Sequence, residues 1–394
     1  MHMFKKSIVM LRQRLCSLQN VFGEGFVVGE RFEVSYLIGA DYKQSVEMAK
    51  DICLEQTVEI PIDLVPEGHI KENILGRVED VAECEKGFRA IISFDEDITA
   101  FEITGFLNVL FGNISLKPGI EVESFKLTPN MTKYFKGPKF GRDGIRKCIN
   151  NKNRPILATA LKPMGLTAKA FSEYAYKFAL GGIDIIKDDH GLSNQSYASF
   201  GERVKYCAEA VQRANAKTGL NCVYAPNVTA EHADVYKRAV IAKENGVGAL
   251  LIAPGLAGFS VMKNLAEDKD LNLPLISHPS FLGSFVTGGG GLSHYTLFGQ
   301  IMRLSGADAS IYPNFGGRFS FSKKECSNIV EGTNCEMSNI KPIFPMPGGG
   351  MKIEKMQEMK SFYQNDVIYL MGGGLVSCGA DLASNCRKFR DALE

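Results

Sequence analysis

Eight short apolar runs recur through residues 138–394, and they limit the possible folds more than any other feature of the chain. The stretches between them have helical periodicity; in residues 168–180, for example, Phe171, Tyr174 and Phe178 share one face. Strands that alternate with helices form a parallel sheet, and eight such units close into a barrel. We therefore predict an α/β fold with a C-terminal (β/α)8 TIM barrel over residues 138–394. The predicted strands are Ile156–Leu161, Ile183–Ile186, Cys222–Tyr224, Ala249–Ile252, Leu275–Ile276, Ala309–Tyr312, Ile343–Phe344 and Val367–Leu370.

A different pattern fills residues 29–137 and predicts a separate α+β domain. Strand and helix signals follow one another in a β-α-β-β-α-β order, which is that of a ferredoxin-like domain. In chain order, these signals lie at Phe32–Tyr36, 43–55, Arg77–Val81, Phe88–Phe94, Ile98–Leu110 and Ile120–Leu127. The basic, turn-rich segment Lys133–Gly141 is the predicted linker to the barrel.

The net charge and the cysteine spacing argue against a nucleic-acid-binding protein and against a metal site built from cysteines. The net charge is only +1 and the basic residues are scattered, which argues against a nucleic-acid partner. The ten cysteines form neither a CxxC pair nor a metal-ligand spacing, and such dispersed cysteines are typical of a cytoplasmic protein.

Residues 1–28 hold a run, Ile8–Leu11, that is too short to span a bilayer, and no secretory cleavage site follows it. We predict an amphipathic N-terminal extension and no membrane partner.

Charged and polar side chains follow the predicted barrel strands at their carboxyl ends, where this fold carries its chemistry. They are Lys162 after the first strand, Lys187, Asp188, Asp189 and His190 after the second, Asn227 after the third, His278 after the fifth, and Asn314 and Arg318 after the sixth. Such a concentration on one rim predicts an active site. The alternative is that some of these residues only stabilise one another as an ion-pair network.

Two glycine triplets predict a phosphate site. Gly348–Gly350 follows the seventh strand and Gly372–Gly374 the eighth. Glycine lets backbone N–H groups approach an anion, and the loops after strands 7 and 8 are the usual phosphate site of the barrel.

The second strand predicts a site for a divalent metal. Strand alternation places Lys187 and Asp189 on the cavity side and Asp188 toward the barrel wall. A lysine ammonium has no lone pair for a metal, so Lys187 could bind Mg²⁺ only after CO₂ converts it into a carbamate.

These motifs resemble the large chain of RuBisCO. The resemblance rests on GGIDIIKDD at Gly181–Asp189, on Leu161-Lys162-Pro163 before it, on Gly137-Pro138 at the start of the barrel and on Arg303-Leu304-Ser305-Gly306 before the sixth strand. It covers nearly the whole chain.

The resemblance implies a role for several residues of the barrel. Lys162 matches the catalytic base, and His278 matches a catalytic histidine. Lys187 matches the lysine that is carbamylated, and Asp189 a carboxylate that binds Mg²⁺ beside it; we expect one Mg²⁺ per site, with His190 at or next to the metal. The alternative for His190 is a proton shuttle outside the metal sphere.

The resemblance also implies ligand contacts and a shared site. The phosphate contacts are assigned to Gly348, Gly349, Gly372 and Gly373, and Arg318 stands where the loop after strand 6 carries its lysine. Asn108 and Asn227 are further expected ligand contacts. Glu55 resembles the glutamate that completes a neighbouring subunit's site, which implies a homodimer with composite active sites.

Departures from the family pattern argue against CO₂ fixation. His190 replaces a metal-binding glutamate, and the loop Pro163-Met164-Gly165 is one residue short and lacks a second lysine. Pro279, Ile311 and Pro347 replace an arginine, a histidine and a serine that surround one phosphate of ribulose bisphosphate. Each lost charge-assisted hydrogen bond is worth roughly 1.5–3 kcal/mol. We therefore expect a substrate with one phosphate and a less polar opposite end.

This combination resembles the form IV RuBisCO-like proteins, and among them the group that acts on 5-methylthioribulose 1-phosphate in methionine salvage. The implied reaction is isomerisation through an enediolate. Three alternatives stay open: decarboxylation of 3-oxo-isoapionate 4-phosphate, enolisation of 2,3-diketo-5-methylthiopentyl 1-phosphate, and a non-catalytic phosphate-binding scaffold.

Overall fold

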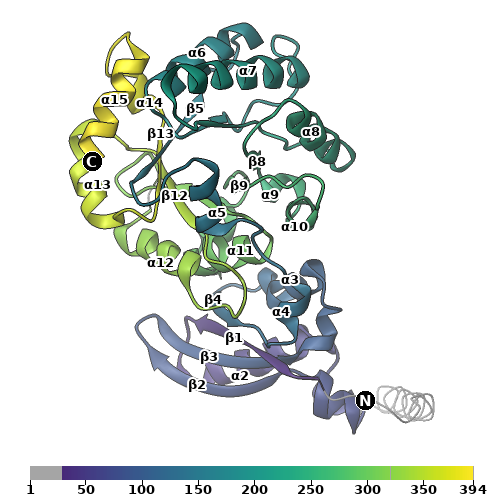
Figure 1. The fold of residues 1–394 in the computed structure, drawn as a ribbon. Helices are drawn as coiled ribbons and strands as arrows, with labels where there is room; N and C mark the ends of the chain where they lie inside the picture. Colours follow the sequence, from purple (N-terminus) through teal and green to yellow (C-terminus); the bar gives the residue numbers. More distant parts are fainter. Residues whose placement is uncertain (1–28, 320, 394) are drawn as a thin grey trace. The chain divides into compact units, whose positions relative to one another are not determined.

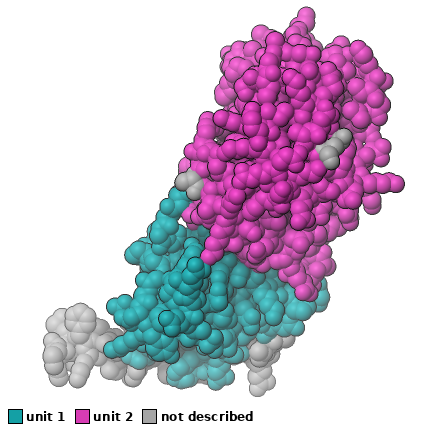
Figure 2. Space-filling model, turned by 90° about the vertical axis from the view of Figure 1, so that its left-hand side faces the viewer, with its two compact units in different colours: residues 1–134, 287–293 teal, residues 135–286, 294–394 magenta. Residues whose placement is uncertain are grey.

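The computed structural model describes residues 29–319 and 321–393, which fall into two compact units. The first unit holds the chain up to Tyr134 and the short segment Thr287–Ser293, and the second holds Phe135–Val286 and the chain from His294 onward (Figure 2). The sequence placed the boundary at residue 137 and did not assign 287–293 to the first unit. The predicted N-terminal extension, residues 1–28, lies outside the described residues.

The first unit has the predicted β-α-β-β-α-β order. Its elements are β1 (Arg31–Ile38), α2 (Tyr42–Glu55), β2 (Arg77–Cys84), β3 (Gly87–Asp95), α3 (Ile103–Phe111) and β4 (Ile120–Lys126), followed by the short helix α4 (Met131–Tyr134). The strands pair antiparallel in the order β4-β1-β3-β2, the order of a ferredoxin-like sheet. The two-residue strand β10 (Gly291–Leu292) adds a parallel edge beside β4.

Alternation along β1 explains how this sheet buries its core. Phe32, Val34 and Tyr36 are fully buried on one face, while Glu33 is exposed. The ring of Phe32 lies 5.6 Å from that of Phe94 on β3 and 5.5 Å from that of Phe106 on α3, measured between centroids. Aromatic contacts of this kind fasten the helix to the sheet.

The second unit is the predicted eight-stranded barrel (Figure 1). Its strands are β5 (Ile156–Leu161), β6 (Ile185–Asp188), β7 (Val223–Ala225), β8 (Leu250–Ile252), β9 (Leu275–Ser277), β11 (Ala309–Pro313), β12 (Phe344–Gly348) and β13 (Ile368–Met371). They pair in the order β7-β6-β5-β13-β12-β11-β9-β8. A parallel bridge between Asn227 and Leu251 joins the β7 and β8 ends and closes the ring.

Helices surround the barrel strands (Figure 1). They are α5 (Gly141–Cys148), α6 (Ala168–Leu180), α7 (Phe200–Thr218), α8 (His232–Glu244), α9 (Pro254–Ala257), α10 (Phe259–Glu267), α11 (Met302–Leu304), α12 (Lys323–Asn334), α13 (Met356–Tyr363), α14 (Gly373–Val376) and α15 (Leu382–Leu393). None of the helices in the described part of the chain is both long and apolar enough to cross a membrane.

The barrel interior is filled with apolar side chains. Ile156, Leu251 and Ile368 contribute from three strands, and Ile145 and Ile149 from α5 and its C-terminal end join the same cluster. Because this packed interior leaves no channel through the barrel, ligand chemistry is confined to the loops at the strand ends.

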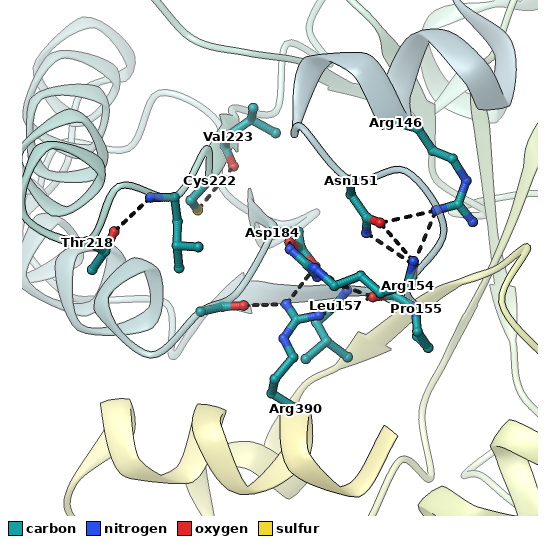
Figure 3. A network of polar contacts seen from close by, with 12 residues as sticks. Arg146, Asn151, Arg154, Pro155, Leu157, Asp184, Thr218, Cys222, Val223 and Arg390 are labelled. Carbon is teal, nitrogen blue, oxygen red and sulfur yellow. Dashed lines mark hydrogen bonds and ion pairs between the residues drawn. The ribbon is translucent and has the colours of Figure 1, made fainter. Parts of the chain in front are cut away.

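A polar network fixes the C-terminal helix to the amino end of the strands (Figure 3). The buried carboxylate of Asp184 pairs with Arg154 through two hydrogen bonds of 2.6 and 2.9 Å. It also accepts hydrogen bonds from Arg390 of α15 at 2.7 Å and from the backbone N–H of Leu157 at 2.8 Å. Asp184 thus connects α15, β5 and the start of β6.

Candidate active site

Five of the predicted side chains meet at the carboxyl ends of β5, β6 and β9. The Nζ atom of Lys162 lies 2.9 Å from Oδ1 of Asp189, and Nδ1 of His190 lies 3.5 Å from the same oxygen. The rings of His190 and His278 stack with their centroids 4.4 Å apart and an interplanar angle of 12°. Lys187 is close enough to His278 to lower the pKa of that imidazole.

Strand alternation at the end of β6 is as predicted. Asp188 is fully buried and points away from the cavity, toward Arg203 of α7 and Tyr224 of β7. Asp189, on the opposite side, faces Lys162 and His190. The alternation therefore gives the two adjacent aspartates different surroundings.

Lys187 is buried, and its pKa is lowered. Its side chain is 2% exposed, and Nζ donates a hydrogen bond to the backbone oxygen of Asp188 at 2.9 Å. Burial lowers the pKa of Lys187 to about 8, and the positive charge of Lys162 acts in the same direction. A substantial fraction of this amine is therefore neutral near physiological pH.

Asp189 stays ionised in the cluster. Burial alone would raise the pKa of its carboxyl, but the neighbouring His190 and Lys162 outweigh burial and hold that pKa well below its usual range. A carboxylate at this position is available as a counter-charge for Lys162 or as an oxygen ligand for a cation.

His278 is neutral, and its hydrogen bonds indicate which nitrogen carries the proton. Burial lowers its pKa to about 2, with Lys187 and His190 adding to the effect. The backbone N–H of Ser280 donates to Nδ1 at 3.2 Å, so Nδ1 is an acceptor and the proton lies on Nε2. The hydroxyl of Ser280 lies 2.9 Å from the same Nδ1. His278 can therefore donate a hydrogen bond from Nε2 without carrying a charge.

The glycine loops present open backbone. Nothing in the described chain lies within 4 Å of where a Cβ would sit on Gly349, Gly372 or Gly373. Gly349 has a φ of 93°, a left-handed conformation that favours glycine. Gly348, by contrast, is the last residue of β12, where an added Cβ would lie 3.0 Å from the Leu370 side chain. Three of the four predicted glycines thus have the exposure that an anion site requires.

The loops after β11, β12 and β13 lie side by side. A Cβ on Gly317 would lie 3.2 Å from the carbonyl carbon of Gly349, and one on Gly374 would collide with the backbone oxygen of Met351. Arg318 follows Gly317 directly, so its backbone lies next to the loop that carries Gly349. Its exposed guanidinium lies 5.5 Å from the ring centroid of Phe319.

The metal prediction depends on the modification of Lys187. No group of three His, Cys, Asp or Glu side chains suited to a metal occurs among the described residues. Asp189 and His190 supply two donors, and a carbamate on Lys187 would supply a third. The neutral amine that carbamylation needs is favoured by the lowered pKa of Lys187. The donor set therefore fits Mg²⁺ once Lys187 is carbamylated, and does not fit it before.

Glu55 and Asn108 lie in the first unit. Glu55, the last residue of α2, accepts a hydrogen bond from Asn113 at 3.3 Å, and Lys117 lies 3.8 Å from it. Asn108 lies within α3, where its backbone oxygen accepts a hydrogen bond from Gln56. The asparagine beside Glu55 is therefore Asn113, a residue that was not predicted from the sequence.

Asn227 uses its amide within the protein. Nδ2 donates to the backbone oxygens of His190 and Leu192, at 2.9 Å each, and Oδ1 accepts from the N–H of Thr229 at 3.1 Å. The side chain is 3% exposed. Both N–H bonds of the Asn227 amide are thus occupied by backbone oxygens. A contact between Asn227 and a ligand stays a prediction.

Comparison with known proteins places this geometry in a family. Residues 142–394 match the family model of the ribulose bisphosphate carboxylase large chain, catalytic domain. The chain is 30% identical to the 5-methylthioribulose-1-phosphate isomerase of Rhodospirillum rubrum, over 91% of this chain and 95% of that protein. The chain belongs to the RuBisCO large chain family.

Further relatives agree with its placement as a form IV RuBisCO-like protein. It is 32% identical to the 2,3-diketo-5-methylthiopentyl-1-phosphate enolase of Bacillus pumilus, over 81% of this chain and 80% of that protein. The crystal structure of a Rubisco-like protein from Rhodopseudomonas palustris matches with a TM-score of 0.81 and 33% identity, over 92% of this chain and 97% of that one. The family resemblance and the fold class predicted from the sequence are thereby confirmed.

The RuBisCO-like chain has apolar residues where the family pattern has polar ones. Ile311 is 4% exposed and belongs to the apolar cluster of the barrel interior. Pro347 is buried on β12, opposite Tyr312 of β11. Neither side chain can donate a hydrogen bond to a phosphate, and Pro279, directly after His278, cannot donate one either.

Proposed function

We propose that this RuBisCO-like protein is an isomerase that acts on 5-methylthioribulose 1-phosphate through an enediolate. The observation that carries the proposal is the cluster of Lys162, Asp189, His190 and His278 at the rim that also bears the open glycine loops. A base, a neutral hydrogen-bond donor and an anion cradle are the groups that proton transfer next to a carbonyl requires.

The binding side of the proposal rests on charge and polarity. A single phosphate suits the backbone N–H groups of Gly349, Gly372 and Gly373. Arg318 follows Gly317, whose backbone lies beside Gly349, and adds a positive charge near these loops. Pro279, Ile311 and Pro347 leave a second phosphate without charge-assisted partners, which argues against ribulose bisphosphate as the substrate and therefore against CO₂ fixation. A methylthio group needs no such partners.

The proposed reaction assigns one task to each residue. Lys162 acts as the base: after its ammonium has released a proton to solvent, its amine takes the proton from the carbon next to the carbonyl, so that the C–H bond breaks and an enediolate forms. The proton then returns to the former carbonyl carbon. At the same time the hydroxyl proton on the deprotonated carbon passes to the former carbonyl oxygen, so that the carbonyl forms again at the carbon that lost its hydrogen. His278 donates its Nε2 hydrogen to a substrate oxygen, which stabilises the negative charge that develops there.

Carbamylated Lys187, Asp189 and His190 would hold Mg²⁺, whose charge stabilises the oxygens of an enediolate when the ion is bound. Because Asp189 lies beside both Lys162 and His190, a cation held by these residues would act close to the proposed base.

The test is proton and phosphorus NMR of 5-methylthioribulose 1-phosphate incubated with the protein, Mg²⁺ and bicarbonate. An isomerase produces new sugar resonances, with the phosphate ester retained and the mass unchanged. A spectrum that stays unchanged with folded, metal-supplied protein would contradict the proposal. The same incubation with the Lys162→Met variant controls for non-enzymatic rearrangement.

The enolase is the second candidate, because a relative of that name is 32% identical over 81% of this chain. It is distinguished by its substrate: only an enolase converts 2,3-diketo-5-methylthiopentyl 1-phosphate. Release of CO₂ from 3-oxo-isoapionate 4-phosphate would instead indicate the decarboxylase, and absence of turnover on all three would favour a phosphate-binding scaffold.

A further inference from the structure

The loop after β6 carries His190, and two buried side chains from other elements hold its backbone. Asn227, at the end of β7, donates both hydrogens of Nδ2 to this loop, at the oxygens of His190 and Leu192. The backbone N–H of Asn227 donates in turn to Oδ2 of Asp188 at 3.0 Å. One residue therefore contacts the chain on both sides of Asp189.

Arg203 of α7 holds the same loop further along. Its Nη2 donates to the oxygen of Ser193 and its Nη1 to the oxygen of Ala198, at 2.8 Å each. Its Nε donates to Oδ2 of Asp188 at 3.2 Å. Arg203 and Asp188 are both fully buried, so these bonds are shielded from water and hold the loop firmly.

The His190 side chain, by contrast, is held weakly. It is 48% exposed, and its ring contacts in the described chain are Asp189 at 3.5 Å and the stacked ring of His278. Because these contacts are few, the ring can keep its stack on His278 only if the backbone holds the His190 Cα in place. The hydrogen bond from Asn227 to the His190 oxygen acts on that backbone directly.

We propose that Asn227 is a positioning residue: by holding the backbone of His190 and Leu192, it sets the stack of His190 on His278 and thereby the geometry of the reaction centre. Arg203 supports it by holding Ser193 and Ala198 in the same loop. The expected effect on turnover rests on the proposed function. The expected effect on the histidine stack does not. Outer hydrogen-bond partners of this kind commonly change activity by 10–100-fold.

The stack itself can be observed in solution. The chain has six histidines, so protein labelled with ¹³C at histidine Cε1 gives few resonances, and His190→Gln and His278→Gln variants assign two of them. Stacked rings shift one another's resonances, so a displaced His190 changes both signals. We expect Asn227→Ala to shift both, and to lower kcat for 5-methylthioribulose 1-phosphate about 10–100-fold with a smaller change in KM.

Asn215→Ala is the matched control. Asn215 of α7 also uses its amide to hold a loop, donating to the Cys222 oxygen at 2.8 Å and accepting from the Cys222 N–H at 2.9 Å. These bonds lie before β7, at the opposite end of the strand from Asn227. Its loss should lower the unfolding temperature in a similar way while leaving the His190 and His278 resonances and kcat unchanged.

Arg203→Lys is the second variant, should Asn227→Ala not fold. Lysine keeps the charge beside Asp188 but cannot reproduce the planar arrangement that reaches both Ser193 and Ala198. It should shift the same two resonances by a smaller amount. Unchanged resonances in whichever of these variants folds would overturn the proposal. Shifted resonances in a protein without activity on 5-methylthioribulose 1-phosphate would support the positioning role and reject the proposed function.

Discussion

At the scale of single residues, two lysines at the ends of neighbouring strands have different surroundings and suit different chemistry. Lys162, directly after β5, has a side chain that is 43% exposed and an ion pair with Asp189. Lys187, on β6, is 2% exposed and has a pKa lowered to about 8. The exposed lysine can reach a substrate, whereas the lowered pKa of the buried one suits the carbamylation that we propose.

Replacing Lys162 with methionine should abolish turnover and leave the fold intact. Methionine keeps most of the side-chain volume but has no titratable amine. We expect kcat to fall by more than tenfold, while circular dichroism and the unfolding temperature stay close to those of the wild type. Lys169→Met, at an exposed position of α6, is the control and should keep full activity. Retention of more than a tenth of kcat would exclude Lys162 as the essential base.

Replacing His190 with glutamate should tighten metal binding. Mg²⁺ prefers oxygen ligands, and glutamate adds a negative charge where histidine offers a neutral nitrogen. Titration with Mn²⁺, followed by its paramagnetic resonance signal in the presence of bicarbonate, measures the affinity directly. The control is Lys187→Met, which cannot form a carbamate and should bind the metal weakly. Equal affinity of the glutamate variant and the wild type would place residue 190 outside the metal sphere.

At the scale of elements, the sequence predicted the strands better than it predicted the contacts of their end residues. The barrel strands appear as apolar runs because both of their faces are buried, and this periodicity is visible in the sequence. The strand β10 was missed because two residues, Gly291 and Leu292, carry no periodicity. The hydrogen bonds of Asn227 to the loop after β6 were not predicted, because a polar residue after a strand can face a ligand or a neighbouring loop, and sequence does not distinguish the two.

Asp308 makes the attachment of α5 to the barrel sensitive to pH. Its carboxylate accepts backbone hydrogen bonds from Phe140 and Gly141 at the start of α5 and from Leu275 of β9. Burial raises the pKa of Asp308 to about 6 despite these bonds. A carboxyl whose pKa is raised by folding stabilises the fold fully below its unfolded pKa, near 4, and loses that contribution as pH rises to about 6.

The expected size of this loss is of the order of 3 kcal/mol between pH 4 and pH 7. The Asp308→Asn variant does not titrate and is the reference. As pH rises from 4.5 to 7, the unfolding temperature of the wild type, measured by calorimetry, should fall relative to that of this variant. If the unfolding temperature of the wild type stays constant or rises relative to that of Asp308→Asn over this pH range, the backbone donors rather than burial dominate the Asp308 pKa.

The Asp184 network should be a main support of the C-terminal helix. Asp184→Ala leaves Arg154 and Arg390 without their shared partner, and breaking a buried pair typically costs about 3 kcal/mol. For a chain of this size, the unfolding temperature should fall by roughly 4 °C. Asp234→Ala removes the exposed pair with Lys237 and should leave that temperature nearly unchanged. A small effect of Asp184→Ala would mean that apolar packing and the hydrogen bonds from Arg390 to the Pro155 and Gly182 oxygens are enough to hold α15.

At the scale of the whole molecule, the family resemblance implies that each active site needs two subunits. Glu55 lies at the end of α2 in the first unit, whereas Lys162 and Lys187 belong to the barrel of the second. The side chain of Glu55 is 34% exposed and is held by Asn113 and Lys117. Its carboxylate is thus held in place and accessible. A group that completes another subunit's site needs both properties.

Mixing two inactive variants tests this shared site. Subunits with Glu55→Gln and subunits with Lys162→Met should form heterodimers in which one of the two sites has both an intact barrel and an intact Glu55. Random exchange would restore roughly a quarter of the wild-type activity, because half of the dimers are mixed and each has one working site. A mixture of Lys162→Met and Lys187→Met subunits is the matched control: every site then lacks one barrel lysine, so no activity should return. If the first mixture also stays inactive after mass spectrometry has shown subunit exchange, each site is completed within a single chain.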